Sequence, residues 1–188
     1  MTNEIEFKIF TKNKGLQITV NRVVYPLLFG CISIAYLADK YFDESILESI
    51  GQFGGILVCI LMIYFKIAQS FTRESLNGDL SKNLIFKTSE IIIDDQKLNL
   101  NEIKKIEFYI GDYFNNWEYK VKGDLNPART NGTSNLCELT VQNGKKVRVN
   151  FQLKYKDEFQ KMKELLIVYY LKNKIHFLKL IEYLGIDK

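Results

Sequence analysis

The residue types that most often carry catalysis are few in this sequence. His176 is the single histidine, and it lies between Lys174, Phe177 and Lys179 in a stretch with helical spacing. Histidine is a common general base because its side chain titrates near neutral pH. One histidine without a nearby nucleophile is typical of a surface or interface residue instead, and we favour that interpretation.

The three cysteines also argue against a chemical site. Cys31 and Cys59 fall inside apolar blocks, and Cys137 falls in an expected strand. An odd number of cysteines without a CxxC pair indicates a reducing compartment or simple burial, and it offers no zinc ligand set. Phosphate-binding glycine loops and a GxSxG motif are absent as well. We therefore expect no enzyme activity, no metal and no cofactor.

A polar stretch from Gly111 to Trp117 carries three aromatic side chains. They are Tyr113, Phe114 and Trp117. Aromatic residues in a loop can anchor a protein partner or a membrane surface. The alternative, which we favour, is that they cap the open end of a strand barrel.

Three basic residues, Lys120, Lys122 and Arg129, lie in the stretch that follows. Each could attract anionic lipid headgroups with about 1 kcal/mol, yet they do not cluster as a phosphoinositide site would require. A solvated loop is the interpretation we favour. The net charge of +4 is too small to indicate nucleic-acid binding by itself, and we expect no nucleic-acid partner.

Two long apolar blocks precede most of the residues discussed above. Val23–Ala38 and Ser49–Phe65 contain no charged residue. A bilayer core of about 30 Å needs roughly 20 helical residues. Two buried helices of a soluble protein are the alternative, but such helices usually show a polar stripe. We therefore predict an N-terminal cytoplasmic segment over 1–22, a two-helix transmembrane hairpin over 23–70, and a cytoplasmic domain over 76–188.

Basic residues predict the orientation of this hairpin. Lys8, Lys12, Lys14 and Arg22 precede the first block, Lys40 is the one basic residue between the blocks, and many follow the second. Short basic segments stay on the cytoplasmic side. We therefore predict a multi-pass protein of the bacterial inner (cytoplasmic) membrane with both termini in the cytoplasm.

Small residues in the second block predict close helix packing. Gly51 and Gly55 have small-xxx-small spacing, which lets two helix backbones approach. Gly30, Ser33 and Ala35 of the first block are possible complements. We favour packing within the hairpin over a dimer interface.

The pattern changes to short alternating runs after residue 76. Asn143–Gly144 predicts a tight hairpin turn, and Asp94–Asp95 a second turn. Seven short strands at close spacing predict an antiparallel β-barrel or sandwich. We expect these strands over residues 83–87, 90–94, 97–100, 103–110, 117–121, 136–141 and 146–151.

Helical spacing returns at the C-terminal end. One helix is expected from about Tyr155 and a second over 174–184, with Gly185 as its stop. Leu165–Leu171 is apolar on every side, so a face that includes Tyr169 and Tyr170 must cover either the next helix or a protein partner. Both alternatives stay open.

This order of elements resembles the bacterial pleckstrin-homology-like (PH-like) membrane proteins. Glu90–Ile106, a strand, turn and strand followed by an acidic-Ile-basic run, is similar to that family, and so is Gly132–Leu136 before its Asn-Gly hairpin. The resemblance covers residues 23 to about 172, and the helix after Asn173 departs from it. It implies a membrane α-helical hairpin plus an α+β soluble domain, with a PH-like barrel or sandwich and a C-terminal helix.

The function that we expect is that of a non-enzymatic adaptor. The hairpin would hold the domain at the membrane lipid, where its effective concentration for a membrane-bound protein partner is high. An immunity protein that neutralises a toxin and a lipid-surface sensor are the alternatives.

Overall fold

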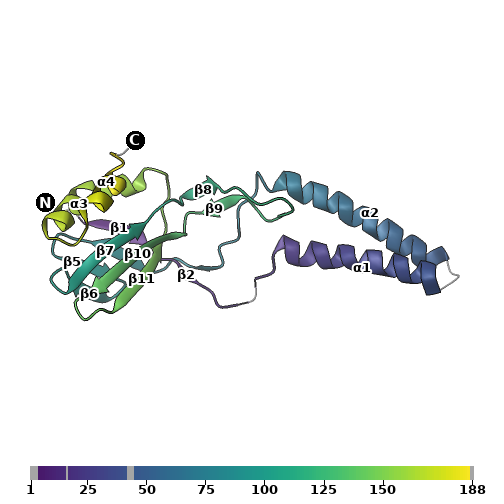
Figure 1. The fold of residues 1–188 in the computed structure, drawn as a ribbon, viewed down its shortest axis with the longest axis horizontal. Helices are drawn as coiled ribbons and strands as arrows, with labels where there is room; N and C mark the ends of the chain where they lie inside the picture. Colours follow the sequence, from purple (N-terminus) through teal and green to yellow (C-terminus); the bar gives the residue numbers. More distant parts are fainter. Residues whose placement is uncertain (1–3, 16, 42–44, 187–188) are drawn as a thin grey trace. The chain divides into compact units, whose positions relative to one another are not determined.

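The structure is a computed structural model that describes residues 4–15, 17–41 and 45–186. Its chain divides into two compact units, each built from segments that are distant in the sequence (Figure 1). The hairpin unit comprises Gly15–Glu74 and Trp117–Arg129. The sheet unit comprises Met1–Lys14, Ser75–Asn116 and Thr130–Lys188.

Two long helices, α1 (Val20–Tyr41) and α2 (Ser45–Ala68), form the core of the hairpin unit. They contain 22 and 24 residues, which at 1.5 Å per residue is about 33 and 36 Å. Both are long and apolar enough to cross a membrane, as predicted. Only 6% and 11% of their apolar windows are buried, whereas a core helix of a soluble protein buries its apolar face.

The close approach of α1 and α2 depends on two glycines. A Cβ added to Gly51 would lie 2.6 Å from the backbone nitrogen of Ala35, and one added to Gly54 would lie 2.9 Å from Sγ of Cys31. A Cβ on Gly55 would keep 4.0 Å to Cβ of Cys31, and Gly30 has no neighbour within 4 Å. The geometry therefore agrees with hairpin packing at Gly51, while Gly54, which the sequence did not single out, takes the role expected of Gly55.

Two antiparallel sheets form the sheet unit. Their strand orders are β1-β4-β5-β6 and β11-β10-β7. The predicted turns are confirmed, since Asp94 (φ 56°) and Gly144 (φ 83°) take the left-handed conformation between paired strands. The strand bounds are Ile5–Lys8 (β1), Asn83–Phe86 (β4), Glu90–Ile93 (β5), Gln96–Asn99 (β6), Ile103–Tyr109 (β7), Asn135–Val141 (β10) and Lys146–Phe151 (β11).

Strand β1 was not expected, and it corrects the predicted division of the chain. It pairs with β4, with Ile5 opposite Phe86, and Ile9 then bridges to Phe151 of β11. The N-terminal residues thus belong to the sheet unit and connect its two sheets. The prediction of a separate segment over 1–22 is wrong for this part, because Ile5, Phe7 and Ile9 alternate as a half-buried strand does.

The predicted strand over 117–121 is also wrong. The strand here is β8 (Phe114–Trp117), which pairs with β9 (Arg129–Asn131) in a small sheet of its own. A second small sheet joins β2 (Thr11–Lys12) to β3 (Gly78–Asp79). After Trp117 the chain leaves β8 for a loop, so Tyr119 and Val121 alternate along the chain without being part of a strand.

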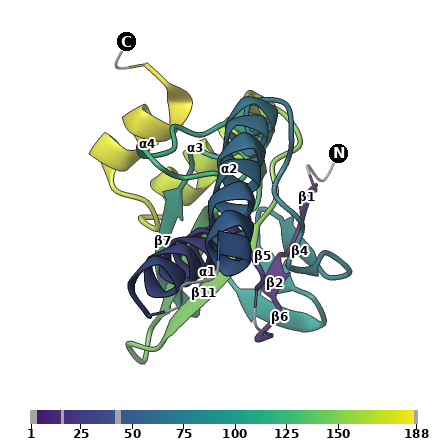
Figure 2. The same ribbon diagram turned by 90° about the vertical axis from the view of Figure 1, so that its right-hand side faces the viewer.

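Helical segments complete the sheet unit, and Figure 2 shows α3 and α4 together beside the strands. The helix expected from Tyr155 begins as a 3₁₀ turn, η1 (Glu158–Met162), and continues as α3 (Lys163–Leu171). The last helix, α4 (Phe177–Leu184), ends at Gly185 with φ 65°, as predicted.

The core of the sheet unit is rich in aromatic rings. The ring of Phe7 lies 5.2 Å from Phe151, 6.0 Å from Phe86 and 6.3 Å from Phe159, measured between centroids. The N-terminal strand, both sheets and η1 therefore meet at one side chain. The hydroxyl of Tyr183 from α4 accepts a hydrogen bond of 2.8 Å from the backbone N–H of Phe108, which holds that helix on the core.

Gly51→Ala should weaken the hairpin, because the new methyl group would collide with the backbone at Ala35. We expect a loss of about 1–3 kcal/mol. Gly30→Ala is the matched control and should be neutral or stabilising by up to about 1 kcal/mol. The measurement is an SDS titration in mixed micelles, with maleimide labelling of Cys31 in a background without the other two cysteines. Equal midpoints for both variants would contradict helix contact at Gly51.

Phe7→Ala should destabilise the sheet unit by about 3–5 kcal/mol, as expected for a buried aromatic residue. Burial raises the pKa of the Cys137 thiol, so this thiol reports opening of the core when Cys31 and Cys59 are replaced by serine. Labelling of Cys137 in increasing urea gives the free energy of unfolding. Tyr109→Ala, at a half-exposed position, is the control with little expected effect. A Phe7→Ala protein as stable as this control would show that β1 is not part of the core.

Candidate functional site

Residues Trp117–Arg129, here called the clasped loop, are held against the ends of the two long helices within the hairpin unit. Asn21 at the start of α1 makes two hydrogen bonds to it. Its Nδ2 donates to Oδ1 of Asp124 at 2.9 Å, and its Oδ1 accepts from the backbone N–H of Leu125 at 2.9 Å. One amide side chain thus satisfies a carboxylate and a backbone donor of the loop.

The end of α2 holds the same loop from the other side. Nε2 of Gln69 donates to the backbone oxygens of Asp124 (3.1 Å) and Asn126 (2.8 Å), and the backbone carbonyl of Gln69 accepts from the N–H of Ala128 at 2.9 Å. Nζ of Lys66 donates to the backbone oxygen of Asp124 at 3.1 Å. Because Gln69 is buried, leaving its polar atoms without these partners would be costly.

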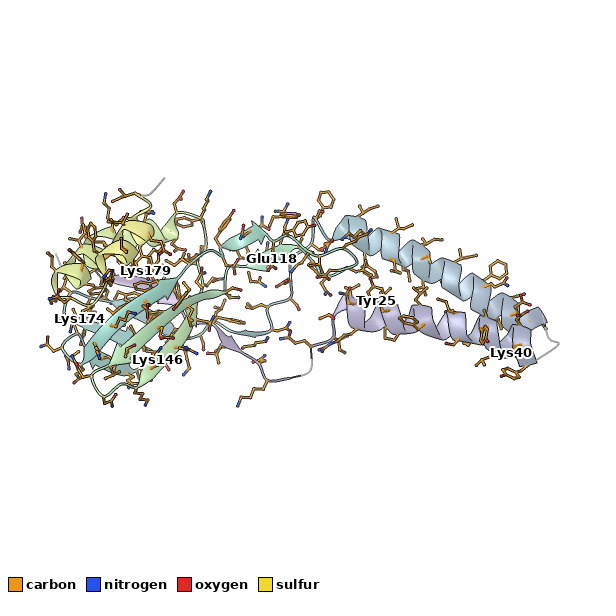
Figure 3. The ribbon with its side chains drawn as sticks, in the orientation of Figure 1. Tyr25, Lys40, Glu118, Lys146, Lys174 and Lys179 are labelled. Carbon is orange, nitrogen blue, oxygen red and sulfur yellow. The ribbon has the colours of Figure 1, made fainter. Side chains whose placement is uncertain are left out.

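Apolar contacts add to this polar clasp. Leu125 is buried together with Val24 of α1 and Val58 of α2. The hydroxyl of Tyr25, labelled in Figure 3, donates to the backbone oxygen of Gly123 at 2.5 Å. The loop is therefore fixed to both helices by a buried side chain as well as by hydrogen bonds.

The predicted aromatic trio is divided by the structure. Tyr113 packs against the core of the sheet unit and Phe114 is half-exposed in β8, whereas Trp117 belongs to the hairpin unit. The ring of Trp117 lies instead near Tyr119, with 6.3 Å between centroids. Tyr119 and Val121 are also exposed. Sequence analysis predicted Trp117 as a site residue but not Tyr119 or Val121. The alternation of these three residues was interpreted as a strand over 117–121.

Lys120 is not available as a lipid-binding cation. Its side chain is 13% exposed, and Nζ lies 2.6 Å from Glu118 and 2.8 Å from Glu74. Figure 3 labels Glu118. Burial disfavours the charge of Lys120, but the hydrogen bonds to Glu118 and Glu74 outweigh this effect and raise its pKa above the ordinary value. The ion pairs of Lys120 therefore stabilise the folded loop.

Arg129 is likewise engaged inside the hairpin unit. Its Nε donates to the backbone oxygen of Ser70 at 2.9 Å. Lys122 is exposed. The three basic residues that the sequence suggested therefore do not form one cationic site.

Helices α3 and α4 present the second candidate surface. Four of their large apolar side chains are exposed, and Leu171 (72%) and Leu178 (66%) are the most exposed. We call this set the helical surface, and its members are Ile167, Leu171, Phe177 and Leu178. Ile167 and Leu171 are four residues apart and so lie on one face of α3.

The two tyrosines predicted to bind a partner have different positions. Tyr169 is fully buried, and its hydroxyl donates to the backbone oxygen of Lys87 at 2.8 Å. Its proposed role in partner binding is therefore wrong, since α3 turns this side chain to the core. Tyr170 is partly buried, and its ring centroid lies 5.8 Å from that of Phe177.

An open groove of about 450 Å³ adjoins Tyr170 and Phe177. Its wall includes Lys174, labelled in Figure 3, whose Nζ donates to the oxygen of Ile103 at 2.7 Å. The carbonyl of Lys174 accepts from the N–H of Ile106 at 2.8 Å. Two aromatic rings, Tyr170 and Phe177, thus line the groove, and hydrogen bonds hold Lys174 of its wall on strand β7. Its lining residues are Lys105, Tyr170, Asn173, Lys174, Ile175, His176 and Phe177.

The most prominent charge cluster of the sheets is structural. Glu138 of β10 is buried, and its carboxylate accepts hydrogen bonds of 2.6 Å from Lys146 and from Arg148 of β11. These two hydrogen bonds hold the pKa of Glu138 below its usual value. Because the charges face each other across paired strands, they stabilise the sheet.

The potential reactive groups do not come together. Burial raises the pKa of the Cys137 thiol, so the nucleophilic thiolate is disfavoured. His176 is exposed and precedes α4. Within residues 4–15, 17–41 and 45–186, no three His, Cys, Asp or Glu side chains are arranged to hold a metal ion.

Comparisons with protein-family models, with curated proteins and with solved structures found no match for this chain. The exposed apolar side chains of the clasped loop and of the helical surface are its candidate functional features.

Asn21→Ala should loosen the clasped loop, because it removes both hydrogen bonds between α1 and the loop. At about 1 kcal/mol for each bond, amide hydrogen exchange of Leu125 should become roughly ten- to thirty-fold faster. Exchange followed by mass spectrometry in detergent micelles measures this change. Lys122→Ala, at an exposed position of the same loop, is the matched control. Unchanged protection in Asn21→Ala would show that the clasp does not hold the loop.

Proposed function

We propose that this protein is a non-enzymatic adaptor of the bacterial cytoplasmic membrane. In this proposal the hairpin of α1 and α2 spans the bilayer, and the sheet unit binds a protein partner at the cytoplasmic face. The observation that carries the proposal is the helical surface, Ile167, Leu171, Phe177 and Leu178. Its large apolar side chains are exposed, and one of them, Phe177, lines a groove together with Tyr170.

The strand arrangement supports a PH-like interpretation of the sheet unit. A four-stranded and a three-stranded antiparallel sheet meet at the bridge from Ile9 to Phe151, and helices follow the last strand. This agrees with the resemblance that the sequence suggested. The hairpin would then be inserted between β1 and β4, two neighbouring strands of the four-stranded sheet.

Strand pairing also supports the proposed topology. Strand β1 precedes α1 in the chain and β4 follows α2, yet the two strands are hydrogen-bonded partners. Paired strands must lie on the same side of a bilayer, so the segments before and after the hairpin share one compartment. The basic residues before α1 and after α2 favour the cytoplasm as that compartment.

A protein partner suits the helical surface better than solvent does. Burying apolar area is favourable by about 25 cal/mol per Å², and aromatic side chains in a partly enclosed groove are typical interface anchors. Phe177 and Tyr170 form such an aromatic wall at the groove. A sensor of lipid charge is less favoured, because Lys120 and Arg129 already have internal partners.

A photo-crosslinking amino acid at Leu178 or Leu171 tests this function in cells that naturally produce the protein. We expect the same crosslinked protein from both positions, because both belong to the helical surface. A crosslinker at Leu76, a partly exposed apolar residue elsewhere on the sheet unit, is the matched control and should not give this product. Leu171→Glu should abolish the product formed at Leu178, since it places a charge in the interface.

Two outcomes would contradict the adaptor function. One is the absence of any crosslinked protein at the helical surface. The other is a product that forms equally at Leu76 and persists in Leu171→Glu, because it would reflect random encounters.

A further inference from the structure

The clasped loop exposes an apolar edge that its own unit does not cover. Trp117 is 54% exposed, Tyr119 78% and Val121 69%. Tryptophan and tyrosine combine an apolar ring with a polar group, and both concentrate at membrane–water interfaces. The three residues alternate along the chain, and the rings of the two aromatic residues are in edge contact.

The clasp fixes the depth of this edge relative to the helices. The loop is bonded to Asn21 and Tyr25 in the first two turns of α1, and to Lys66 and Gln69 at the end of α2. Helices of 22 and 24 residues are about 33 and 36 Å long and slightly exceed a hydrocarbon core of about 30 Å. In a spanning hairpin these helix ends therefore lie at the headgroup level, and so does the loop attached to them.

The loop also meets the main requirement for irregular backbone near lipid. Unsatisfied backbone groups are costly there, but side chains of the two helices satisfy those of the loop. Gln69 and Lys66 donate to the oxygen of Asp124, Gln69 donates to that of Asn126, and Tyr25 donates to that of Gly123. The carbonyl groups that face the helices are thus bonded, while apolar side chains remain exposed.

We propose that Trp117, Tyr119 and Val121 insert into the headgroup and glycerol region of the bilayer leaflet at this end of the hairpin. The clasped loop is then a third membrane-contacting element beside α1 and α2, and its ligand is the phospholipid interface. This inference rests on the proposed membrane insertion of the hairpin. Lys122, exposed in the same loop, would then be close enough to meet the lipid phosphates.

The chain contains a single tryptophan, Trp117, so its own fluorescence tests the proposal without a label. The full chain is reconstituted in phosphatidylcholine vesicles that carry bromine either near the headgroup end or near the methyl end of the acyl chains. We expect a blue-shifted emission and a loss of intensity that is greater with bromine near the headgroup. Iodide on both sides of the membrane should quench weakly.

A second variant separates this inference from membrane insertion itself. Trp117→Phe combined with Phe53→Trp moves the tryptophan to an exposed position within α2. Its emission should be quenched more strongly by bromine near the methyl end. If neither protein is quenched by brominated lipid, the hairpin does not insert, and the proposed function and this inference are both overturned.

Two results would overturn the inference and leave membrane insertion intact. In both, the Phe53→Trp variant is quenched by brominated lipid and native Trp117 is not. If iodide quenches Trp117 fully, the loop lies in water. If iodide does not reach Trp117, protein covers it and the loop is an interface between proteins.

Discussion

A strand that precedes the hairpin pairs with a strand that follows it, and the other features of the chain depend on this pairing. Strand β1 is bonded to β4, and the next residues continue to β11, where the N–H of Phe10 donates to Asn150 at 2.8 Å. Phe7 brings an aromatic ring from this strand to the centre of the core. A bilayer cannot pass between hydrogen-bonded strands, so in the proposed topology α1 and α2 together return the chain to the side from which it entered.

Several charged side chains stabilise the architecture of this protein. Lys120 and Arg129 stabilise the clasped loop, and Glu138 joins β10 to two cations of β11. The two candidate surfaces, the clasped loop and the helical surface, each expose large apolar side chains. Such side chains favour recognition through shape and hydrophobic contact.

The sequence predicted those elements that are determined by residues close together in the chain. The uncharged blocks predicted α1 and α2, because the composition of a segment determines whether it forms a long apolar helix. Asn143–Gly144 predicted a turn and Gly185 a helix end, because glycine readily takes the positive φ that both features require. Strand β1 was missed because it has four residues and its partner lies beyond both helices. A pairing between strands that are so far apart in the chain cannot be predicted from a local sequence pattern.

The errors at the candidate sites have a similar origin. Tyr169 and Tyr170 lie in a helix that is apolar on every side, so periodicity could not tell which of them faces the core. One of the two partners of Lys120, Glu74, is distant in the chain, and that ion pair forms only on folding. Tyr119 and Val121 alternated as strand residues do, and only the hydrogen bonds of Asn21 to their loop reveal another role.

The position of β1 also determines the order in which the protein can be made. This strand is translated before both apolar helices, whereas its partner β4 is translated only after them. Until then Ile5 and Phe7 have neither a neighbouring strand nor a core to bury them. Synthesis of both helices therefore precedes completion of the sheet, and β1 stays without its partner strand until β4 has been made.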